Sequence, residues 1–421
     1  MAAPAIEIFD TQNRSLVQGA LPLMPDTNSR TGRVAIIHDW CPTFRGGERV
    51  LAELCHLFPG ADVFTLFDFL PQAIKDRHFP GVQFNTSIAN KLPLIKKYYR
   101  SLFFLCPFLI EQFDVTDYDM VVSSSAAFSR GVLTRPDQPH LCYVHSPVRY
   151  AWDEQFSYLE QGRLGYGPKG LLYRKMLHNL RTWDTRTAHG PDVMIANSNY
   201  VRLRIQRIYG RDASVIHPPV ELDQLTYVEN KDSYYVTAAF LAPYKRTDLV
   251  IQAFNEMPSK RLLVVGDGQQ LAKLRELAGP NVKILGFLPR SEYVEVIANA
   301  QALVFAGCED FGIALAEAQA CGTPLIAFGR GGASDIVRPL GVSNQPTGIL
   351  FARQSVAAIK EAINHFENYP ASIKPEDCRK NAARFGKDVF RRGIRLAVDA
   401  TLQRHNDQGR TRLNTYAAQA Q

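Results

Sequence analysis

Two carboxylates eight positions apart, Glu309 and Glu317, lie on either side of a Phe-Gly turn. The apolar run before them, residues 302–306, is typical of a buried strand, and the Ala-, Leu- and Glu-rich stretch after Gly312 has a helical pattern that stops at Gly322. We therefore expect Glu309 on the loop at the carboxyl end of a strand, and Glu317 about one turn into the next helix. This edge of an open α/β sheet is where ligands bind.

This loop suits a ligand that carries both phosphate and hydroxyl groups. Free N–H groups at a helix start favour a phosphate, and carboxylates accept hydrogen bonds from sugar hydroxyls. The alternative is a strand, a loop and a solvated helix face with scattered acids, which an isolated pair of glutamates would favour. The Phe311-Gly312 turn between the acids, and the Ala-Cys-Gly-Thr-Pro-Leu-Ile-Ala run after them, favour the ligand site.

Composition narrows the class of protein. The chain has 421 residues, roughly two to three domains, and 46% of them are hydrophobic. No apolar run reaches the roughly 18 residues of a membrane span, and the N-terminus lacks a secretion pattern. Seven cysteines without a C-x-x-C pair fit a reducing cytosol and favour neither disulfides nor a zinc site. The net charge of +7 favours anionic partners, which leaves nucleic acid, anionic lipid and nucleotide sugars open.

Strand and helix patterns alternate along most of the chain, which predicts parallel sheets covered on both faces. The strands are expected at residues 34–37, 62–66, 120–123, 141–145, 193–197, 234–237, 262–265, 282–285, 302–305 and 324–327. Pro218 and Pro219 cannot continue a helix or a central strand, so we place a domain hinge there. The predicted organisation is a flexible tail over 1–30, a first Rossmann-like domain over 31–220, a second over 221–385 and a C-terminal helix over 386–405.

With these neighbours, the segment from Cys308 to Gly322 resembles the signature of retaining glycosyltransferases of family 4. The resemblance extends over most of residues 33–395. It implies the GT-B fold, an α/β architecture of two Rossmann-like domains that face a central cleft. It also implies that the C-terminal helix crosses back onto the first domain.

The resemblance also implies where a nucleotide-sugar donor binds. Gly46 and Gly47 follow the first strand and open a helix, where glycine lets the backbone approach a pyrophosphate, although an ordinary tight turn would use the same residues. Lys245 is placed to neutralise a leaving diphosphate, with a solvated basic loop as the alternative. Glu309 is assigned to the donor sugar and Glu317 to the ribose hydroxyls. The implied donor-binding set is Gly46, Gly47, Lys245, Arg246, Gly266, Glu309, Phe311, Gly312, Ile313 and Glu317, with no metal ion.

One position departs from the family pattern. Phe240 stands where the family usually has an arginine that contacts phosphate. Arg246 and Arg149 are candidates to supply the missing charge, and the sequence leaves the choice between them open.

The segment 143–153 joins a strand end to His145, Arg149 and Asp153. A lone histidine is more often a structural hydrogen-bonding residue, but the resemblance places His145 near the exocyclic oxygen of the sugar or the reaction centre. His145, Glu309 and Lys245 are therefore the predicted catalytic residues, and Arg149 and Asp153 are further candidates. This segment resembles a bacterial subgroup that transfers mannose to a polyprenyl-diphosphate-linked saccharide in exopolysaccharide and O-antigen assembly.

A basic and aromatic segment, residues 90–110, carries Lys91, Lys96, Lys97 and Arg100 beside many apolar side chains. Such a segment can lie in a membrane interface, where each cation is attracted to anionic lipid by roughly 1 kcal/mol. We expect these cations to serve a lipid-linked acceptor and an anionic membrane surface. The alternative is a core helix with one basic face.

Together these observations predict a cytoplasmic enzyme, peripheral to the inner face of the plasma membrane, that needs no cofactor. The resemblance to the mannose-transferring subgroup implies that it moves an α-mannosyl residue from GDP-mannose to a polyprenyl-diphosphate-linked oligosaccharide. A family 4 transferase with a UDP-sugar donor, a sugar-nucleotide epimerase of the same fold, and a basic binding module without enzymatic activity are the alternatives. No nucleic-acid partner is expected, because no RNA-binding pattern of aromatic and basic residues on short strands is present.

Overall fold

The computed structural model describes residues 31–162, 164–369 and 372–419, with side chains described as far as residue 405 apart from residue 161. The predicted N-terminal tail over residues 1–30 lies outside these residues. Within the described part of the chain, no helix is both long and apolar enough to cross a lipid bilayer.

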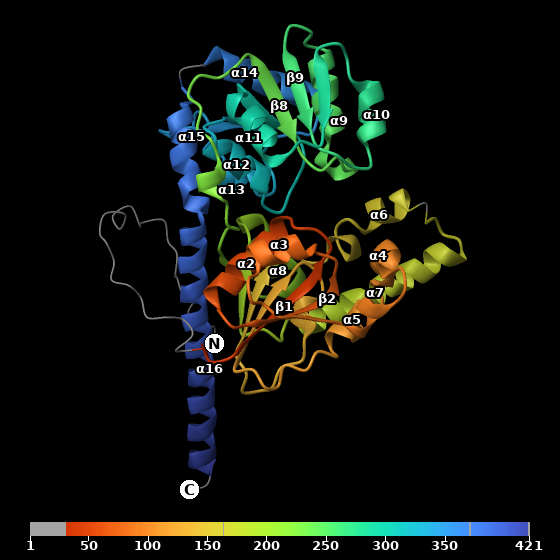
Figure 1. Ribbon diagram of the computed structural model, residues 1–421, viewed down its shortest axis with the longest axis vertical. Coiled ribbons are helices and arrows are strands. Elements are labelled where there is room, and N and C mark those ends of the chain that lie inside the picture. The colour runs from red at the N-terminus through yellow and green to blue at the C-terminus, as the bar shows by residue number, and fades with distance from the viewer. Residues whose placement is uncertain (1–30, 163, 370–371, 420–421) are drawn as a thin grey trace.

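The N-terminal domain is built on a seven-stranded parallel sheet of order β3-β2-β1-β4-β5-β6-β7 (Figure 1). Its strands are β1 (Val34–Cys41), β2 (Asp62–Asp68), β3 (Phe84–Thr86), β4 (Met120–Ser125), β5 (His140–Val144), β6 (Val193–Ala196) and β7 (Ser214–Val215). Its α-helices are α2 (Gly46–Leu57), α3 (Gln72–His78), α4 (Ile95–Tyr98), α5 (Cys106–Ile110), α6 (Gln155–Gln161), α7 (Pro168–Thr187) and α8 (Asn199–Tyr209). Its 3-10 turns are η1 (Ile88–Lys91), η2 (Tyr99–Leu102), η3 (Ser129–Gly131) and η4 (Arg149–Ala151).

The C-terminal domain is built on a six-stranded parallel sheet of order β10-β9-β8-β11-β12-β13. Its strands are β8 (Tyr234–Ala238), β9 (Arg261–Val265), β10 (Val282–Gly286), β11 (Ala302–Phe305), β12 (Leu325–Phe328) and β13 (Gly348–Phe351). Its α-helices are α9 (Thr247–Asn255), α10 (Leu271–Leu277), α11 (Arg290–Asn299), α12 (Ile313–Ala320), α13 (Ala333–Ile336), α14 (Val356–Asn368) and α15 (Pro375–Ala382), and α16 (Lys387–Gln419) ends the described chain. The remaining 3-10 turns are η5 (Leu222–Gln224), η6 (Pro243–Lys245) and η7 (Ala383–Phe385).

The predicted α/β architecture of two Rossmann-like domains is confirmed, and every expected strand overlaps a strand of the structure. The strands β3, β7 and β13 were not predicted. All three lie at sheet edges and span two to four residues. β3 and β7, with three and two residues, carry too little periodicity to stand out in a sequence, whereas β13 is as long as β11 and β12 and was not recognised.

Alternating side chains of β1 show why the first sheet is covered on both faces. Ile36 packs into a cluster with side chains of α2 and α16, whereas Ile37 packs into a second cluster with side chains of α5 and α7. Successive residues of a strand point to opposite faces, and a strand buried on both sides reads as a continuous apolar run. This explains why β1 was recognisable in the sequence.

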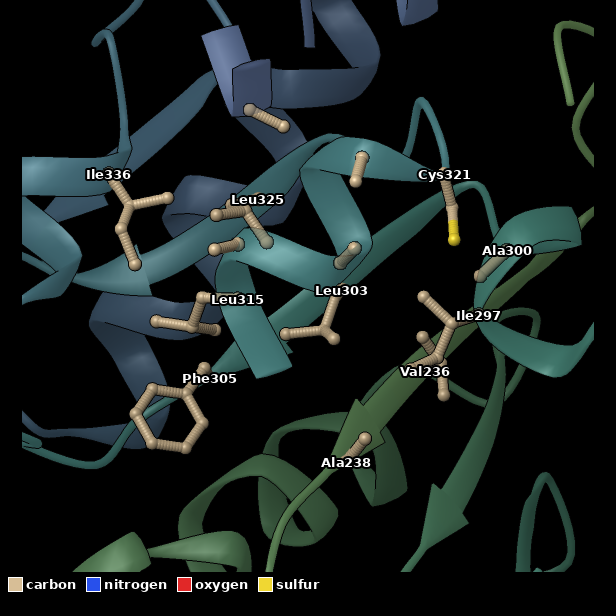
Figure 2. Close-up of a cluster of buried hydrophobic side chains, with 14 of the residues drawn as sticks. Val236, Ala238, Ile297, Ala300, Leu303, Phe305, Leu315, Cys321, Leu325 and Ile336 are labelled. Atoms are coloured by element: carbon tan, nitrogen blue, oxygen red, sulfur yellow. The ribbon is translucent and has the colours of Figure 1, made fainter. Parts of the chain in front are cut away.

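The core of the C-terminal domain fixes the helix that carries Glu317. Figure 2 shows Leu315 of α12 beside Leu303, Phe305 and Leu325 of the neighbouring strands, all buried. Small residues make up most of the rest of α12, and they let the helix lie close to the sheet. The position of Glu317 is therefore set by close packing, which resists displacement.

Both domains place their first strand at the point where the strand order reverses. β1 lies between β2 and β4, and β8 lies between β9 and β11. The loops after β1 and β8 therefore leave their sheets at the topological switch points, where open α/β sheets bind ligands.

The C-terminal helix α16 descends from the C-terminal domain along the side of the N-terminal domain (Figure 1). Phe390, Ile394 and Val398 are buried in the core of the N-terminal domain. At its start, Arg391 pairs with Glu53 of α2 across 2.7 Å. The helix runs 33 residues to Gln419, beyond the expected end at residue 405.

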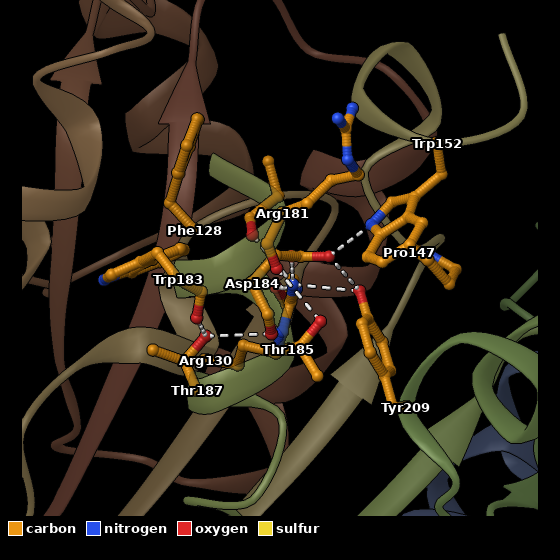
Figure 3. Close-up of polar contacts among 12 residues, drawn as sticks. Phe128, Arg130, Pro147, Trp152, Arg181, Trp183, Asp184, Thr185, Thr187 and Tyr209 are labelled. Atoms are coloured by element: carbon orange, nitrogen blue, oxygen red, sulfur yellow. Dashed lines mark hydrogen bonds and ion pairs between the residues drawn. The ribbon is translucent and has the colours of Figure 1, made fainter. Parts of the chain in front are cut away.

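A fully buried ion pair joins α7 to the sheet of the N-terminal domain (Figure 3). The side chains of Arg130 in η3 and Asp184 in α7 are both completely inaccessible to solvent. The Asp184 carboxylate also accepts hydrogen bonds from Trp152 Nε1 at 2.7 Å and from the Tyr209 hydroxyl at 3.0 Å. Since burying one charge without its partner is costly, the position of α7 depends on this network.

Replacing Asp184 with alanine should lower the free energy of unfolding by about 3–5 kcal/mol, because the Arg130 guanidinium would stay buried without its counter-charge. Urea titration followed by circular dichroism measures the loss. The double variant Arg130→Met/Asp184→Leu buries no charge and should lose far less stability. A single variant as stable as the wild type would contradict the role assigned to the pair.

Candidate active site

A cavity of about 510 Å³ opens at the carboxyl ends of β1, β4 and β5. The end of β1 contributes His38 and Trp40, the loop into α2 contributes Arg45 and Gly47, and the end of β5 contributes His145. The cavity thus lies at the first switch point, and we call it the N-terminal cavity.

A hydrogen-bonded chain runs along its inner wall. The Ser124 hydroxyl lies 2.8 Å from His145 Nε2 and 3.1 Å from His38 Nδ1. Burial lowers the pKa of His38 to about 4 and that of His145 to about 3, so both rings are neutral at neutral pH. His145 lines this cavity, and His38 is a partner that the sequence analysis did not assign.

Asp39 has a structural role beside this chain. Its two carboxylate oxygens accept hydrogen bonds from four successive backbone amides, those of residues 126–129, at 2.6–2.7 Å. The side chain is buried, so these bonds supply the compensation that a buried carboxylate needs. They fix the end of β1 against the loop after β4.

A second cavity, of about 380 Å³, opens at the carboxyl ends of β8, β9 and β10, beside the start of α12. Phe240 and Phe287 contribute exposed rings, and Gly266 lies at its floor. A Cβ atom on Gly266 would lie 1.9 Å from the Ala239 carbonyl oxygen, so only glycine fits there. We call this the C-terminal cavity, and Arg45 lines it as well as the N-terminal cavity.

The loops after β8 and β11 bring Lys245 and Glu309 into a direct ion pair. Burial, and to a lesser degree the charge of Arg149, lower the pKa of Lys245 to about 7. The carboxylates of Asp310 and Glu154 oppose this by favouring the charged lysine. Two residues predicted separately from the sequence therefore form one unit.

Glycines shape the loop that carries Glu309. Gly312 has φ +97°, a left-handed conformation that suits glycine and starts α12 directly after the Phe-Gly turn. Gly332 lies against the backbone of Phe311, where a Cβ atom would come within 2.0 Å of the carbonyl oxygen. The Phe311 ring is buried against Phe385 and His217. Phe311 can therefore contact a donor through its backbone rather than its ring.

The glycine loop of the N-terminal domain meets the start of α12. A Cβ atom on Gly46 would lie 2.9 Å from Ile313 Cδ1, so the two predicted donor-binding residues are in contact across the cleft. Gly47 lies beside His38, at 3.6 Å from Cε1 by the same measure. These loops from opposite domains therefore border the same space.

Glu317 is held by cations from both domains. Its Oε1 atom lies 2.8 Å from Arg290 Nη2 and 2.9 Å from Arg49 Nη1, and Oε2 accepts a hydrogen bond from the Tyr293 hydroxyl at 3.0 Å. Burial alone would raise the pKa of Glu317, but Arg290 and Arg49 more than offset it and hold the pKa below its ordinary value. The side chain is thus a carboxylate with ionic partners that the sequence analysis did not predict.

Arg246, Arg149 and Asp153 lie in ion pairs of their own. Arg246 binds Asp248 in the first turn of α9. Arg149 pairs with Glu154 and lies 3.6 Å from Asp310. Asp153 binds Arg204 at 2.5 Å, away from both cavities. Neither arginine lines the C-terminal cavity, so neither supplies a charge to its wall.

The basic segment over residues 90–110 is broken into short helices rather than one helix. Ile95, Tyr99 and Phe103 are buried in the core, while Lys91, Lys96, Lys97 and Arg100 are exposed. Lys96 and Arg100 line the N-terminal cavity together with Tyr99, whereas Lys91 and Lys97 do not. The segment thus combines a core face with a basic rim at the mouth of the cavity.

Several residues of this region were missed by the sequence analysis, namely His38, Arg45, Glu48, Arg49, Ser124, Arg290, Tyr293 and Asp310. A usable signal existed for the first two, because His38 follows the strand expected over 34–37 and Arg45 begins the glycine loop. Glu48 hydrogen-bonds the Arg45 amide at 2.9 Å, and burial raises its pKa to about 7. The partners of Glu317 gave no signal, since they depend on contacts between distant segments.

Known structures share this arrangement. Anabaena Alr3699/HepE in complex with UDP superposes with a TM-score of 0.64 at 17% identity, over 87% of this chain and 100% of that one. Sucrose-phosphate synthase from Thermosynechococcus elongatus gives a TM-score of 0.66 at 19% identity, over 92% and 100% of the two chains. At such identities the likeness establishes the GT-B fold alone.

Curated relatives align with this chain over only part of their length. A D-inositol 3-phosphate glycosyltransferase of Mycobacterium tuberculosis (strain ATCC 25618 / H37Rv) is 27% identical over 219 residues, which is 46% of this chain and 44% of the relative. The chain therefore matches less than half the length of this curated relative.

Family models match both halves of the chain. Residues 44–224 match the model described as Glycosyltransferase Family 4, and residues 224–385 match the model described as Glycosyl transferases group 1. The two matches join at the segment between the sheets and together include the loops of both cavities. With the GT-B fold, they show that the chain belongs to the family 4 glycosyltransferases.

Proposed function

We propose that this protein is a retaining glycosyltransferase that moves an α-mannosyl residue from GDP-mannose to a polyprenyl-diphosphate-linked oligosaccharide. The observation that carries the proposal is the pair of cavities at the switch points of the two sheets, which share Arg45 as a common wall. A transferase must hold two substrates side by side, and one cavity is available for each. The C-terminal cavity is proposed for the donor and the N-terminal cavity for the acceptor.

The loops next to the donor cavity, mostly outside its lining, carry groups suited to a nucleoside diphosphate. Amides at the start of α12 and around Gly46 and Gly47 can face phosphate oxygens, and Lys245 can neutralise charge as the diphosphate leaves. Glu309, which contacts Lys245, can accept a hydrogen bond from a donor-sugar hydroxyl. Glu317 is proposed for the ribose hydroxyls, which would share its carboxylate with Arg290 and Arg49.

The proposed transfer breaks the bond between the anomeric carbon and the phosphate oxygen and forms a bond from that carbon to the acceptor oxygen. The acceptor proton passes to the departing phosphate, so attack occurs on the face from which the phosphate leaves. His145, neutral and hydrogen-bonded to Ser124, is suited to orient the sugar rather than to take a proton at neutral pH.

A UDP-sugar is the second candidate donor. The Anabaena protein with the same fold is described in complex with UDP and with UDP-glucose. The choice of base depends on the loops around Phe240 and Phe287, whose shapes differ among proteins of one fold. A sugar-nucleotide epimerase differs from either transferase because it yields a new sugar nucleotide without an acceptor.

Calorimetric titration of the full chain with GDP, UDP and ADP tests the proposal without an acceptor. Binding of GDP in preference to the other two is the expected result. Preference for UDP would keep the transferase and replace the donor. No binding of any of the three would contradict a nucleotide-sugar enzyme.

The charge of Lys245 predicts how donor affinity depends on pH. Its pKa near 7 means that the lysine loses its proton as the pH rises from 6.5 to 9, so affinity for the bound diphosphate should fall by about tenfold over this range. Lys245→Arg keeps its charge throughout and should flatten the decline. The same decline in both proteins would assign the titration to another group, such as Glu48.

The exposed cations over residues 90–110 support a peripheral membrane site. Leu94, Phe104 and Phe108 are exposed beside them, at 69%, 44% and 60% of their surfaces. Exposed apolar and basic side chains on the same short segment suit the interface of an anionic bilayer. A lipid-linked acceptor would then reach the N-terminal cavity from the membrane.

Sedimentation with vesicles containing phosphatidylserine tests this. Lys96→Gln/Lys97→Gln should weaken binding by about 30-fold, since each cation contributes roughly 1 kcal/mol, and added salt should release the wild type. Lys273→Gln/Lys283→Gln, which changes two exposed lysines of the other domain, should bind like the wild type. Equal binding by both double variants would contradict the assigned surface.

A further inference from the structure

The guanidinium of Arg45 lies over the ring of Phe240, 5.0 Å from its centroid. Arg45 belongs to the loop before α2 of the N-terminal domain, and Phe240 to the loop after β8 of the C-terminal domain. The contact therefore joins the two switch-point loops across the cleft. A cation over an aromatic face is attracted by the ring quadrupole, which holds the guanidinium at this position.

Arg45 carries the only positive charge on the described wall of the C-terminal cavity. The remaining described lining is apolar or aromatic apart from Asp267, whose carboxylate accepts a hydrogen bond from the Gly268 amide at 2.7 Å. An anionic ligand in this cavity would therefore meet one side-chain cation in its wall, and that cation comes from the opposite domain.

Most other cations around the cleft are already engaged by carboxylates, whereas Lys96 and Arg100 line the N-terminal cavity and not the C-terminal one. The ion pairs of the engaged cations are Lys245 with Glu309, Arg246 with Asp248, Arg149 with Glu154, Arg204 with Asp310, and both Arg49 and Arg290 with Glu317. Within the described residues, Arg45 has no carboxylate within ion-pair distance, and its side chain is exposed. Its donors remain available to a ligand.

We propose that Arg45 is the residue that binds the diphosphate of the donor from across the cleft, with Phe240 as the platform that positions it. This rests on the proposed function, because it assigns the charge that a nucleoside diphosphate needs in the C-terminal cavity. A guanidinium suits this role, since its planar set of donors can bind two phosphate oxygens at once. Because its platform lies on the other domain, the residue is in place only when the two loops face each other.

The test is calorimetric titration of the full chain and its variants with GDP and UDP, and with GMP and UMP as probes of one phosphate. Arg45→Ala should lower the affinity for the preferred diphosphate by about ten- to hundredfold and the affinity for its monophosphate by less. Arg77→Ala, which removes an exposed arginine of the same domain outside both cavities, should bind like the wild type.

A further pair of variants tests whether a cation at position 240, in the C-terminal domain, can restore the diphosphate affinity that Arg45→Ala loses. Phe240→Arg alone places a second cation beside Arg45 and removes its platform, so the two charges repel. The double variant Arg45→Ala/Phe240→Arg restores one cation at the same place and should regain most of the lost diphosphate affinity. Melting temperatures of all variants establish that each is folded.

The outcomes separate the two proposals. If Arg45→Ala binds the diphosphate as tightly as the wild type does, the role assigned to Arg45 is wrong and the proposed function still stands. No nucleotide binding by the wild type overturns the proposed function, and this assignment with it.

Discussion

Arginines of the N-terminal domain hold carboxylates of the C-terminal domain, and the geometry of the cleft depends on these pairs. Arg204 lies 3.1 Å and Arg149 3.6 Å from the Asp310 carboxylate, on the loop that also carries Glu309. Arg49 reaches Glu317 on α12. Asp310 and Glu317 are both largely shielded from solvent, so removing a partner would leave a poorly solvated charge. The edges of the two sheets are thus held face to face by charge.

These ion pairs also mean that a ligand must compete with partners that the charged side chains already have. Lys245 and Glu309 neutralise each other, and Glu317 binds two arginines, so these charges deep in the cleft already have a partner of opposite sign. A diphosphate that approaches Lys245 competes with a carboxylate, and a ribose that approaches Glu317 competes with Arg49. Ligand affinity therefore depends on the difference between two sets of contacts and on the equilibrium between domain arrangements. Arg45 differs because no carboxylate among the described residues lies within ion-pair distance of its guanidinium.

Much of the framework could be predicted because it depends on local pattern. The strand, turn and helix around Glu309 and Glu317 were readable from apolar runs and from Gly312 and Gly322, and the structure has β11, a loop and α12 there. The short edge strands and the breaks within residues 90–110 were not readable. They depend on neighbours in space, and a few residues carry too little periodicity. For the candidate site, the sequence analysis named His145 and the loops of Lys245 and Glu309, whereas it named neither Arg45 nor the partners of Glu317.

The sequence by itself determined which segments become strands and helices, and which loops leave the carboxyl ends of the sheets. Hydrophobic periodicity and glycine positions are local properties, so they can be recognised in the sequence without knowledge of the fold. Only the tertiary structure decided which charges meet. Arg49 and Glu317 are 268 residues apart, and Arg204 and Asp310 are 106 apart. Exposed charges interact little beyond about 8–10 Å in physiological salt, and no pattern along the chain encodes a distance between domains. The same packing that closes the two sheets on each other places Arg45 on Phe240.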